Sequence, residues 1–213
     1  MMNPLIQKIR ALENTKVKHI IYRRLKEFES FKNKNKEQWF SELCFCILTA
    51  NSKAKSALKI QKELGTRGFC NFCSDDVKAC IIKHKHRFHN NKTKYIIEAR
   101  KYLDIKSIMQ YIISDQGEYK AREWLVENVK GLGYKEASHF LRNIGCTSLS
   151  ILDRHILNLM KEYGYIKKKP ATLTKKKYLE IEITFKNLAE SVDMSLAELD
   201  LYMWYMKTGK VLK

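Results

Sequence analysis

Turn-forming residues are scarce in this chain, and their scarcity restricts its fold more than any other feature. Only two prolines and eight glycines punctuate 213 residues. A protein made of many short strands needs turn residues about every ten positions, so an all-β fold is excluded. Apolar residues instead recur with helical spacing along 39–48 and 137–144. Comparable stripes cover 15–29, 54–64, 91–103, 118–128, 154–163, 176–190 and 195–207. The sequence therefore predicts an all-α protein of about ten helices joined by short loops.

The charge of the chain indicates what it binds. Lysine and arginine number 41 against 23 acidic residues, which gives a net charge of +18. This excess is larger than solubility requires and favours a polyanionic partner, either nucleic acid or an anionic membrane. No apolar run approaches the roughly 20 residues that span a bilayer. Residues 1–10 show no secretory signal. We therefore expect a cytoplasmic protein without a membrane partner, associated with the nucleoid through DNA.

The six cysteines are expected to be reduced thiols, because the chain is long and shows no export signal. Cys70 and Cys73 form a C-x-x-C pair, and Cys80 follows alone. No second pair completes a tetrahedral zinc set, so the sequence predicts no metal site.

Two glycines stand together in Val129-Lys130-Gly131-Leu132-Gly133-Tyr134-Lys135, between two helical stripes. A G-x-G turn permits positive φ and close backbone approach, and it presents free N–H groups at the start of the next helix, where phosphate binds well. An ordinary turn between helices is the alternative interpretation. The positive charge of the chain favours a phosphate-binding helix-hairpin-helix.

Asp153 lies 18 residues after Lys135. A helix over 136–145 is about 15 Å long, and the seven residues 146–152 can return over roughly 23 Å, so the two side chains can meet at one end of that helix. Taken singly, Lys135 could be an exposed phosphate contact, and Asp153 could simply cap the helix that begins at Arg154.

Taken together, these motifs resemble a known family. Gly131-Leu132-Gly133-Tyr134-Lys135, with Asp153 and His155 downstream, is similar to the helix-hairpin-helix superfamily of DNA glycosylases. Three further stretches narrow the resemblance to the archaeal-type, or second, class of 8-oxoguanine DNA glycosylase/AP lyase. They are Leu43-Cys44-Phe45-Cys46-Ile47-Leu48-Thr49-Ala50-Asn51, Lys135-Glu136-Ala137-Ser138-His139-Phe140-Leu141-Arg142-Asn143 and Gly209-Lys210-Val211-Leu212-Lys213.

The resemblance implies a bifunctional base-excision repair enzyme that acts on double-stranded DNA containing 8-oxoguanine. In such a mechanism the damaged nucleotide is flipped into a pocket. The Lys135 amine then attacks C1′, a Schiff base forms, and β-elimination nicks the strand. Asp153 would stabilise the positive charge that develops on the sugar and would orient or activate the lysine. Two alternatives stay open: a glycosylase for another damaged base, and a nonenzymatic helix-hairpin-helix DNA-binding protein.

Further roles are implied for residues around this pair. The expected DNA contacts are Gly131, Gly133, Lys130, Arg154, His155 and Phe88. Phe88 stands where relatives carry a wedge residue that fills the vacated stack, although a core phenylalanine is an equal alternative. Lys213, at the end of the chain, and Trp204 are the candidates for base recognition. Lys213 could also be a frayed terminus, and His155 could be an ordinary surface histidine.

The resemblance also has consequences for cofactors and organisation. Lys130 stands where many relatives have proline, so the hairpin is expected to differ slightly in shape. The last cysteine is Cys146, so the C-terminal iron–sulfur cluster of the endonuclease III branch cannot be built. No cofactor is expected, apart from a monovalent cation at the hairpin carbonyls. We expect a monomer of two helical subdomains, with the hairpin at the basic cleft between them. One covers 36–150 and carries the hairpin at 129–135; the other combines 1–35 with 151–213.

Overall fold

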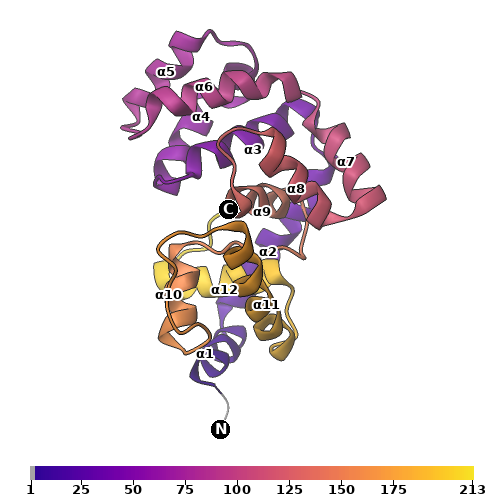
Figure 1. Cartoon of the computed structure of the whole chain (residues 1–213), viewed down its shortest axis with the longest axis vertical. Coiled ribbons are helices and arrows are strands. Elements are labelled where there is room, and N and C mark those ends of the chain that lie inside the picture. Colours follow the sequence, from indigo (N-terminus) through magenta and orange to yellow (C-terminus); the bar gives the residue numbers. More distant parts are fainter. Residues whose placement is uncertain (1–2) are drawn as a thin grey trace. The chain divides into compact units, whose positions relative to one another are not determined.

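The computed structural model describes residues 3–213 and contains helices and loops only (Figure 1). The described residues form twelve α-helices and two short 3-10 helices, with no strand. The predicted all-α class is confirmed. The helix count exceeds the expected one because α1 (Pro4–Glu13), α5 (Ser74–Lys83) and α7 (Ile105–Gln116) were not recognised from their apolar stripes. None of the helices described is both long and apolar enough to cross a membrane.

The chain divides into two compact units. Unit 1 combines Met1–Lys32 with Leu141–Lys213, and unit 2 is Asn33–Phe140. The second boundary falls inside α9 (Tyr134–Asn143), ten residues before the position expected from the sequence. Hydrophobic periodicity gives no reason to divide a continuous helix, so this boundary was not visible in the sequence.

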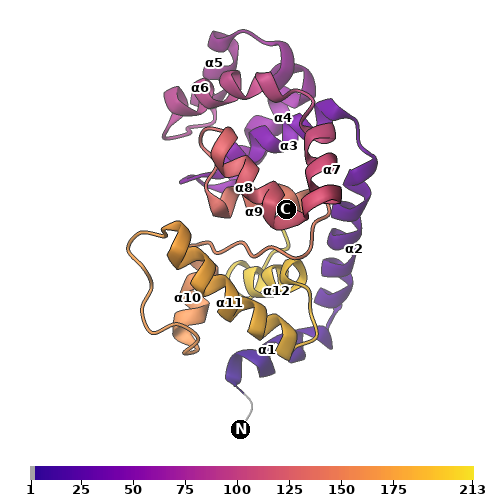
Figure 2. The same cartoon turned by 45° about the vertical axis from the view of Figure 1, so that its right-hand side comes forward.

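Unit 2 is built around α3 (Lys36–Thr49). Every residue of α3 from Trp39 to Thr49 is buried. This helix packs against three others, which explains why it is apolar on all sides rather than along one stripe. The other helices of unit 2 are α4 (Ala54–Asn71), α5, α6 (His89–Ala99), α7, α8 (Glu118–Asn128) and the first part of α9, with the 3-10 turn Arg100–Tyr102 after α6. Helices α5 and α6 lie side by side in both views (Figures 1 and 2).

Unit 1 gathers the two ends of the chain. Its helices are α1, α2 (Lys16–Ser30), α10 (Arg154–Glu162), α11 (Lys175–Ser191) and α12 (Leu196–Thr208). Helix α12 packs against α1, α2, α10 and α11, and its group with α10 and α11 is visible in Figure 2. Most of α12 is buried, from Leu196 to Met203. It is therefore the central helix of unit 1, as α3 is of unit 2.

Buried polar groups fix the start of the segment that leads to Asp153. The guanidinium of Arg142 pairs with the Asp200 carboxylate, and both side chains are only 5% exposed. Downstream, the Ser150 hydroxyl donates to the Glu182 carboxylate at 2.7 Å, and the Tyr178 hydroxyl donates to the Ser150 carbonyl at 2.7 Å. Breaking such buried contacts leaves uncompensated polar groups, so this path of the chain is strongly specified.

Candidate active site

The hairpin lies in unit 2 between α8 and α9. Gly131 has φ +89°, a conformation that favours glycine, and a Cβ there would lie 2.5 Å from the Tyr95 ring. The Leu132 N–H donates to the Val129 carbonyl at 3.2 Å, and the Leu132 side chain is buried. The conformation of the turn is thus restricted by the close approach of Tyr95 to Gly131 and by the burial of the Leu132 side chain.

Lys135 lies in the first turn of α9, directly after the hairpin. Its ammonium is 2.9 Å from the Glu136 carboxylate, and the lysine side chain is 24% exposed. The second oxygen of the same carboxylate accepts the Gly133 N–H at 3.2 Å. One acidic side chain therefore holds both the proposed nucleophile and a hairpin N–H that was expected to face phosphate.

Glu136 is the residue that sequence reasoning missed. A signal was present: a Glu three residues after Gly133 matches the acidic half of a capping box. Its second contact, to the side chain of Lys135, has no such sequence signature. It depends on the rotamers that both side chains adopt on the first turn of α9.

A second lysine is buried beside this pair. Lys92, on α6, is only 5% exposed, whereas Lys94 on the same helix is exposed. Burial lowers the pKa of Lys92 to about 8; the charge of Lys135 acts in the same direction, and the Glu136 carboxylate opposes both. The hairpin end of unit 2 thus contains two amines that share one acidic neighbour.

Two other expected DNA contacts also lie in unit 2. Lys130 is exposed, and its ammonium is 3.2 Å from the Glu98 carboxylate. Phe88 immediately precedes α6 and is half-buried, with the Arg87 guanidinium 4.4 Å from its ring centre. Phe88 is accordingly neither a fully buried core residue nor fully exposed. Its role as a wedge stays a prediction.

Asp153 lies in unit 1 as the N-cap of α10. One carboxylate oxygen, Oδ1, accepts the backbone N–H groups of His155 and Ile156, each at 2.8 Å. Within the described residues, Oδ2 makes no hydrogen bond or ion pair. The capping role of Asp153 is therefore confirmed. It occupies one oxygen and holds the carboxylate in a fixed orientation, with the other oxygen left for further chemistry.

His155 and Trp204 come together in the same unit. Their rings meet edge to face, with centres 5.0 Å apart and planes at 84°. The indole Nε1 of Trp204 is buried and has no hydrogen-bond partner among the described residues. Arg154 is exposed, and Lys213 is half-exposed. The N-terminus of α10 thus links Asp153 to His155, and the His155 ring in turn contacts Trp204. The spacing of residues in the sequence does not indicate that Trp204 belongs to this group.

The expected residues therefore fall into two groups. Lys135, the hairpin, Lys130 and Phe88 belong to unit 2, and Asp153, Arg154, His155, Trp204 and Lys213 belong to unit 1. The expected encounter of the Lys135 amine with the Asp153 carboxylate remains a prediction.

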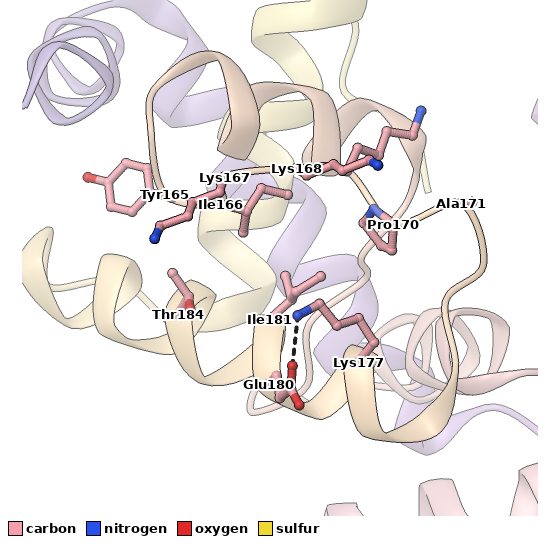
Figure 3. Close-up of a pocket in the computed structure, with 11 residues that line it drawn as sticks. Tyr165, Ile166, Lys167, Lys168, Pro170, Ala171, Lys177, Glu180, Ile181 and Thr184 are labelled. Carbon is pink, nitrogen blue, oxygen red and sulfur yellow. Dashed lines mark hydrogen bonds and ion pairs between the residues drawn. The ribbon is translucent and has the colours of Figure 1, made fainter.

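One cavity in unit 1 includes none of these residues. It measures about 570 Å³ and lies between the loop after α10 and one face of α11 (Figure 3). The chain has two basic triplets here, Lys167–Lys169 and Lys175–Lys177, and both contribute to the lining. Lys177 pairs with Glu180 at 2.8 Å, a contact drawn in Figure 3. Because these lysines are largely exposed, we interpret the segment as a solvated loop.

Comparison with solved structures identifies the class of protein. A crystal structure of an 8-oxoguanine DNA glycosylase from Methanocaldococcus jannaschii superposes with a TM-score of 0.92 at 50% identity, covering 98% of this chain and 96% of that one. The 8-oxoguanine DNA glycosylase of Thermotoga maritima gives the same TM-score at 36% identity over the whole of both chains. A Helicobacter pylori 3-methyladenine DNA glycosylase, at 20% identity and a TM-score of 0.53, shares the fold alone. The fold is that of the DNA glycosylases.

The sequence comparisons are more specific. The family model described as "8-oxoguanine DNA glycosylase" matches residues 21–194. An 8-oxoguanine DNA glycosylase/AP lyase from M. jannaschii is 50% identical over 98% of this chain and 99% of its own length. An 8-oxoguanine DNA glycosylase/AP lyase from Korarchaeum cryptofilum is 43% identical over 100% of this chain and 99% of its own length. The chain belongs to the 8-oxoguanine DNA glycosylase family, which confirms the resemblance recognised from its motifs.

Proposed function

We propose that this protein excises 8-oxoguanine from double-stranded DNA and then nicks the strand at the resulting site. The observation that carries the proposal is Lys135 on the first turn after the hairpin, in a chain that belongs to the 8-oxoguanine DNA glycosylase family. Relatives that match nearly the whole chain are named as combined glycosylase/AP lyases. One relative from M. jannaschii has a crystal structure with a 15mer DNA containing 8-oxoguanine.

Lys135 is the proposed nucleophile. Its neutral amine attacks C1′ of the flipped nucleotide, the bond from C1′ to the base breaks, and the bond electrons and a proton leave with the base. The secondary amine opens the sugar to a Schiff base. Loss of a C2′ proton then expels the 3′ phosphate, which is the lyase step. Because only the neutral amine attacks, the ammonium must first give up its proton and its contact with Glu136.

Asp153 is the proposed electrostatic partner in this reaction. As the base departs, positive charge develops on the sugar, and a fixed carboxylate lowers the energy of that state. The two backbone donors on Oδ1 support this role, because they fix the carboxylate without consuming Oδ2. Both side chains would then act on the same nucleotide.

The remaining expected residues would bind and select the substrate. Gly131, Gly133, Lys130, Arg154 and His155 are proposed to contact phosphates, and Phe88 to fill the stack after flipping. Trp204 and Lys213 are proposed to recognise the base. The buried Trp204 Nε1–H supports this assignment, because a buried donor without a partner is costly and a substrate acceptor would satisfy it.

Three finer points stay part of the proposal. The protein would act as a cytoplasmic monomer on nucleoid DNA. It would need no cofactor. A monovalent cation would be held by carbonyl oxygens of the hairpin.

Borohydride trapping tests the function. The wild-type chain should form a covalent adduct with an 8-oxoguanine duplex when the imine is reduced, and Lys135→Gln should form none while still binding the duplex. Lys120→Gln is the matched control, since it removes an exposed lysine of α8 that has no assigned role, and it should leave trapping intact. Trapping of another damaged duplex but not of 8-oxoguanine would favour a different base. Binding without any adduct from the wild type would favour a nonenzymatic DNA-binding protein.

A further inference from the structure

Three side chains with metal-ligating atoms converge in unit 2, on helices that carry none of the residues assigned above. They are Glu63 on α4, Cys80 on α5 and His84, which directly follows α5. One ligand atom from each lies within 4.8 Å of the other two. The His84 Nε2 is 2.8 Å from the Glu63 carboxylate.

The local fold explains why these groups meet. Cys80 and His84 are four residues apart, a spacing that puts both on one face at the C-terminal end of α5. Glu63 comes from α4, which packs against α5. It stands two residues before Gly65, whose φ of +58° interrupts the helical backbone of α4. Two helices and a turn thus hold the three ligands without any help from the C-x-x-C pair.

We propose that Glu63, Cys80 and His84 bind a divalent transition cation of the zinc type, with water as the fourth ligand. Sulfur, imidazole nitrogen and carboxylate oxygen are the three donors that Zn²⁺ takes, at about 2.3 Å, 2.0 Å and 2.0–2.2 Å. For those bond lengths, the ligand atoms of a tetrahedral site lie about 3.3–3.6 Å from one another. The three ligand atoms here lie within 4.8 Å of one another, so small side-chain rotations would bring them to these distances. Cys80 is 6% exposed while Glu63 is exposed, so one side of the site is open to water.

Charge and protons balance in this site. The Cys80 thiol binds as a thiolate and releases its proton to solvent, so thiolate and carboxylate together neutralise the cation. Lys83 contacts the other Glu63 oxygen at 2.9 Å. Lys83 can keep this contact if the cation binds the Glu63 oxygen that now faces His84. It can also move away into solvent.

The sequence did not reveal this site because its ligands do not come as cysteine pairs. Cys70, Cys73 and Cys80 alone make an incomplete ligand set. Cys80 and His84 have a C-x-x-x-H spacing, which is not a paired-cysteine motif, and Glu63 is brought to them only by the packing of α4 on α5.

Cobalt binding by the reduced full-length chain tests the proposal. Stoichiometric Co²⁺ should give the near-ultraviolet thiolate-to-cobalt absorption together with the visible bands of a four-coordinate site. Cys80→Ser should abolish the thiolate band, and His84→Gln should weaken Co²⁺ binding at least tenfold. The matched control Cys73→Ser removes an exposed cysteine of the C-x-x-C pair and should leave the spectrum unchanged.

A second readout does not depend on the cysteine substitution being tolerated. In the wild-type chain, Zn²⁺ should protect Cys80 from alkylation, as measured by peptide mass spectrometry, and should leave Cys73 reactive. His84→Gln should remove that protection, with circular dichroism used to verify the fold. The proposal is overturned if the wild type shows no thiolate-to-cobalt absorption. It is equally overturned if the absorption survives in Cys80→Ser or disappears in Cys73→Ser.

Discussion

The two regions that carry the proposed chemistry hold their key side chains in opposite ways. In unit 2 the Lys135 ammonium is held by one side chain, Glu136, which must be given up before the amine can react. In unit 1 the Asp153 carboxylate is held by two backbone donors of α10, through one oxygen only. The proposed nucleophile is thus restrained by a side-chain contact that can be released, and the proposed electrostatic partner by backbone contacts that persist. A reacting group must change its state during turnover, whereas a charge that stabilises a transition state works best when it is already in place.

The largest expected effect separates the two duties of Asp153. Asp153→Asn keeps an oxygen that can cap α10 but removes the negative charge, so base excision should slow by about 10²–10³-fold with little change in stability. Asp153→Ala should lose the same activity and, in addition, about 1 kcal/mol of stability through the missing cap. Single-turnover excision and urea unfolding of both variants provide the measurements. An Asn variant with near-wild-type excision would show that capping is the whole role of Asp153.

The hairpin offers a test of its backbone. Gly131→Ala should destabilise the protein by about 2–3 kcal/mol, because Ala is strained at positive φ and its Cβ would collide with Tyr95. Gly133→Ala is the matched control, since its Cβ would meet only the end of the Glu136 side chain at 3.3 Å. Its cost should stay below about 1 kcal/mol, close to an ordinary surface substitution. Equal losses in the two variants, measured by chemical denaturation, would contradict this account of the turn.

Lys92 makes the stability of unit 2 depend on pH. Its pKa is lowered to about 8 in the folded protein, against about 10.4 when unfolded, so the unfolded chain binds more protons between these values. Stability should therefore rise as pH increases through that window. Lys92→Met should stabilise the protein by about 3 kcal/mol at pH 7, and the gain should vanish near pH 10.5. Urea titrations at the two pH values test this, with the exposed Lys94→Met as control. A pH-independent gain would show that the effect comes from packing alone.

The smallest expected effect concerns the contact that restrains the nucleophile. Glu136→Gln keeps an oxygen for the Gly133 N–H but removes the carboxylate charge that pairs with the Lys135 ammonium. Borohydride trapping near neutral pH should accelerate by about two- to fivefold, which corresponds to the weak coupling of a partly exposed ion pair. A slower variant would mean that Glu136 assists the reaction instead of restraining the amine.

The sequence predicted the helical class and the hairpin because both rest on local signals. Apolar spacing follows helices wherever one face is buried, and Gly131 marks a turn whose positive φ the structure confirms. Gly145 also has positive φ, as is common just after the end of a helix. The stripe over 91–103 is in fact α6 followed by a 3-10 turn, a change in hydrogen bonding that apolar spacing does not register. Helix α9 ends at Asn143, two residues before the expected end, because Gly145 stands beyond the last helical residue.

The details of the candidate site were less accessible for a physical reason. The Lys135 contact with Glu136, the burial of Lys92 and the Trp204 contact with His155 all arise from tertiary packing and rotamers. Lys92 and Lys94 are both cations on one helix, and nothing in their types indicates that one is buried and the other exposed. The family resemblance supplied the identities of Lys135 and Asp153, but not the neighbours that control their charge.

The two contacts of Glu136 have a consequence for the order of events on DNA. One of its oxygens accepts the Gly133 N–H and the other pairs with the Lys135 ammonium. A phosphate bound at the hairpin would therefore compete with Glu136 for the Gly133 N–H. In the proposed mechanism, a DNA phosphate bound at the hairpin would weaken the contact between Glu136 and the Lys135 amine when a nucleotide is present to be attacked. Without DNA, the same contact would keep that amine paired and away from other carbonyl compounds.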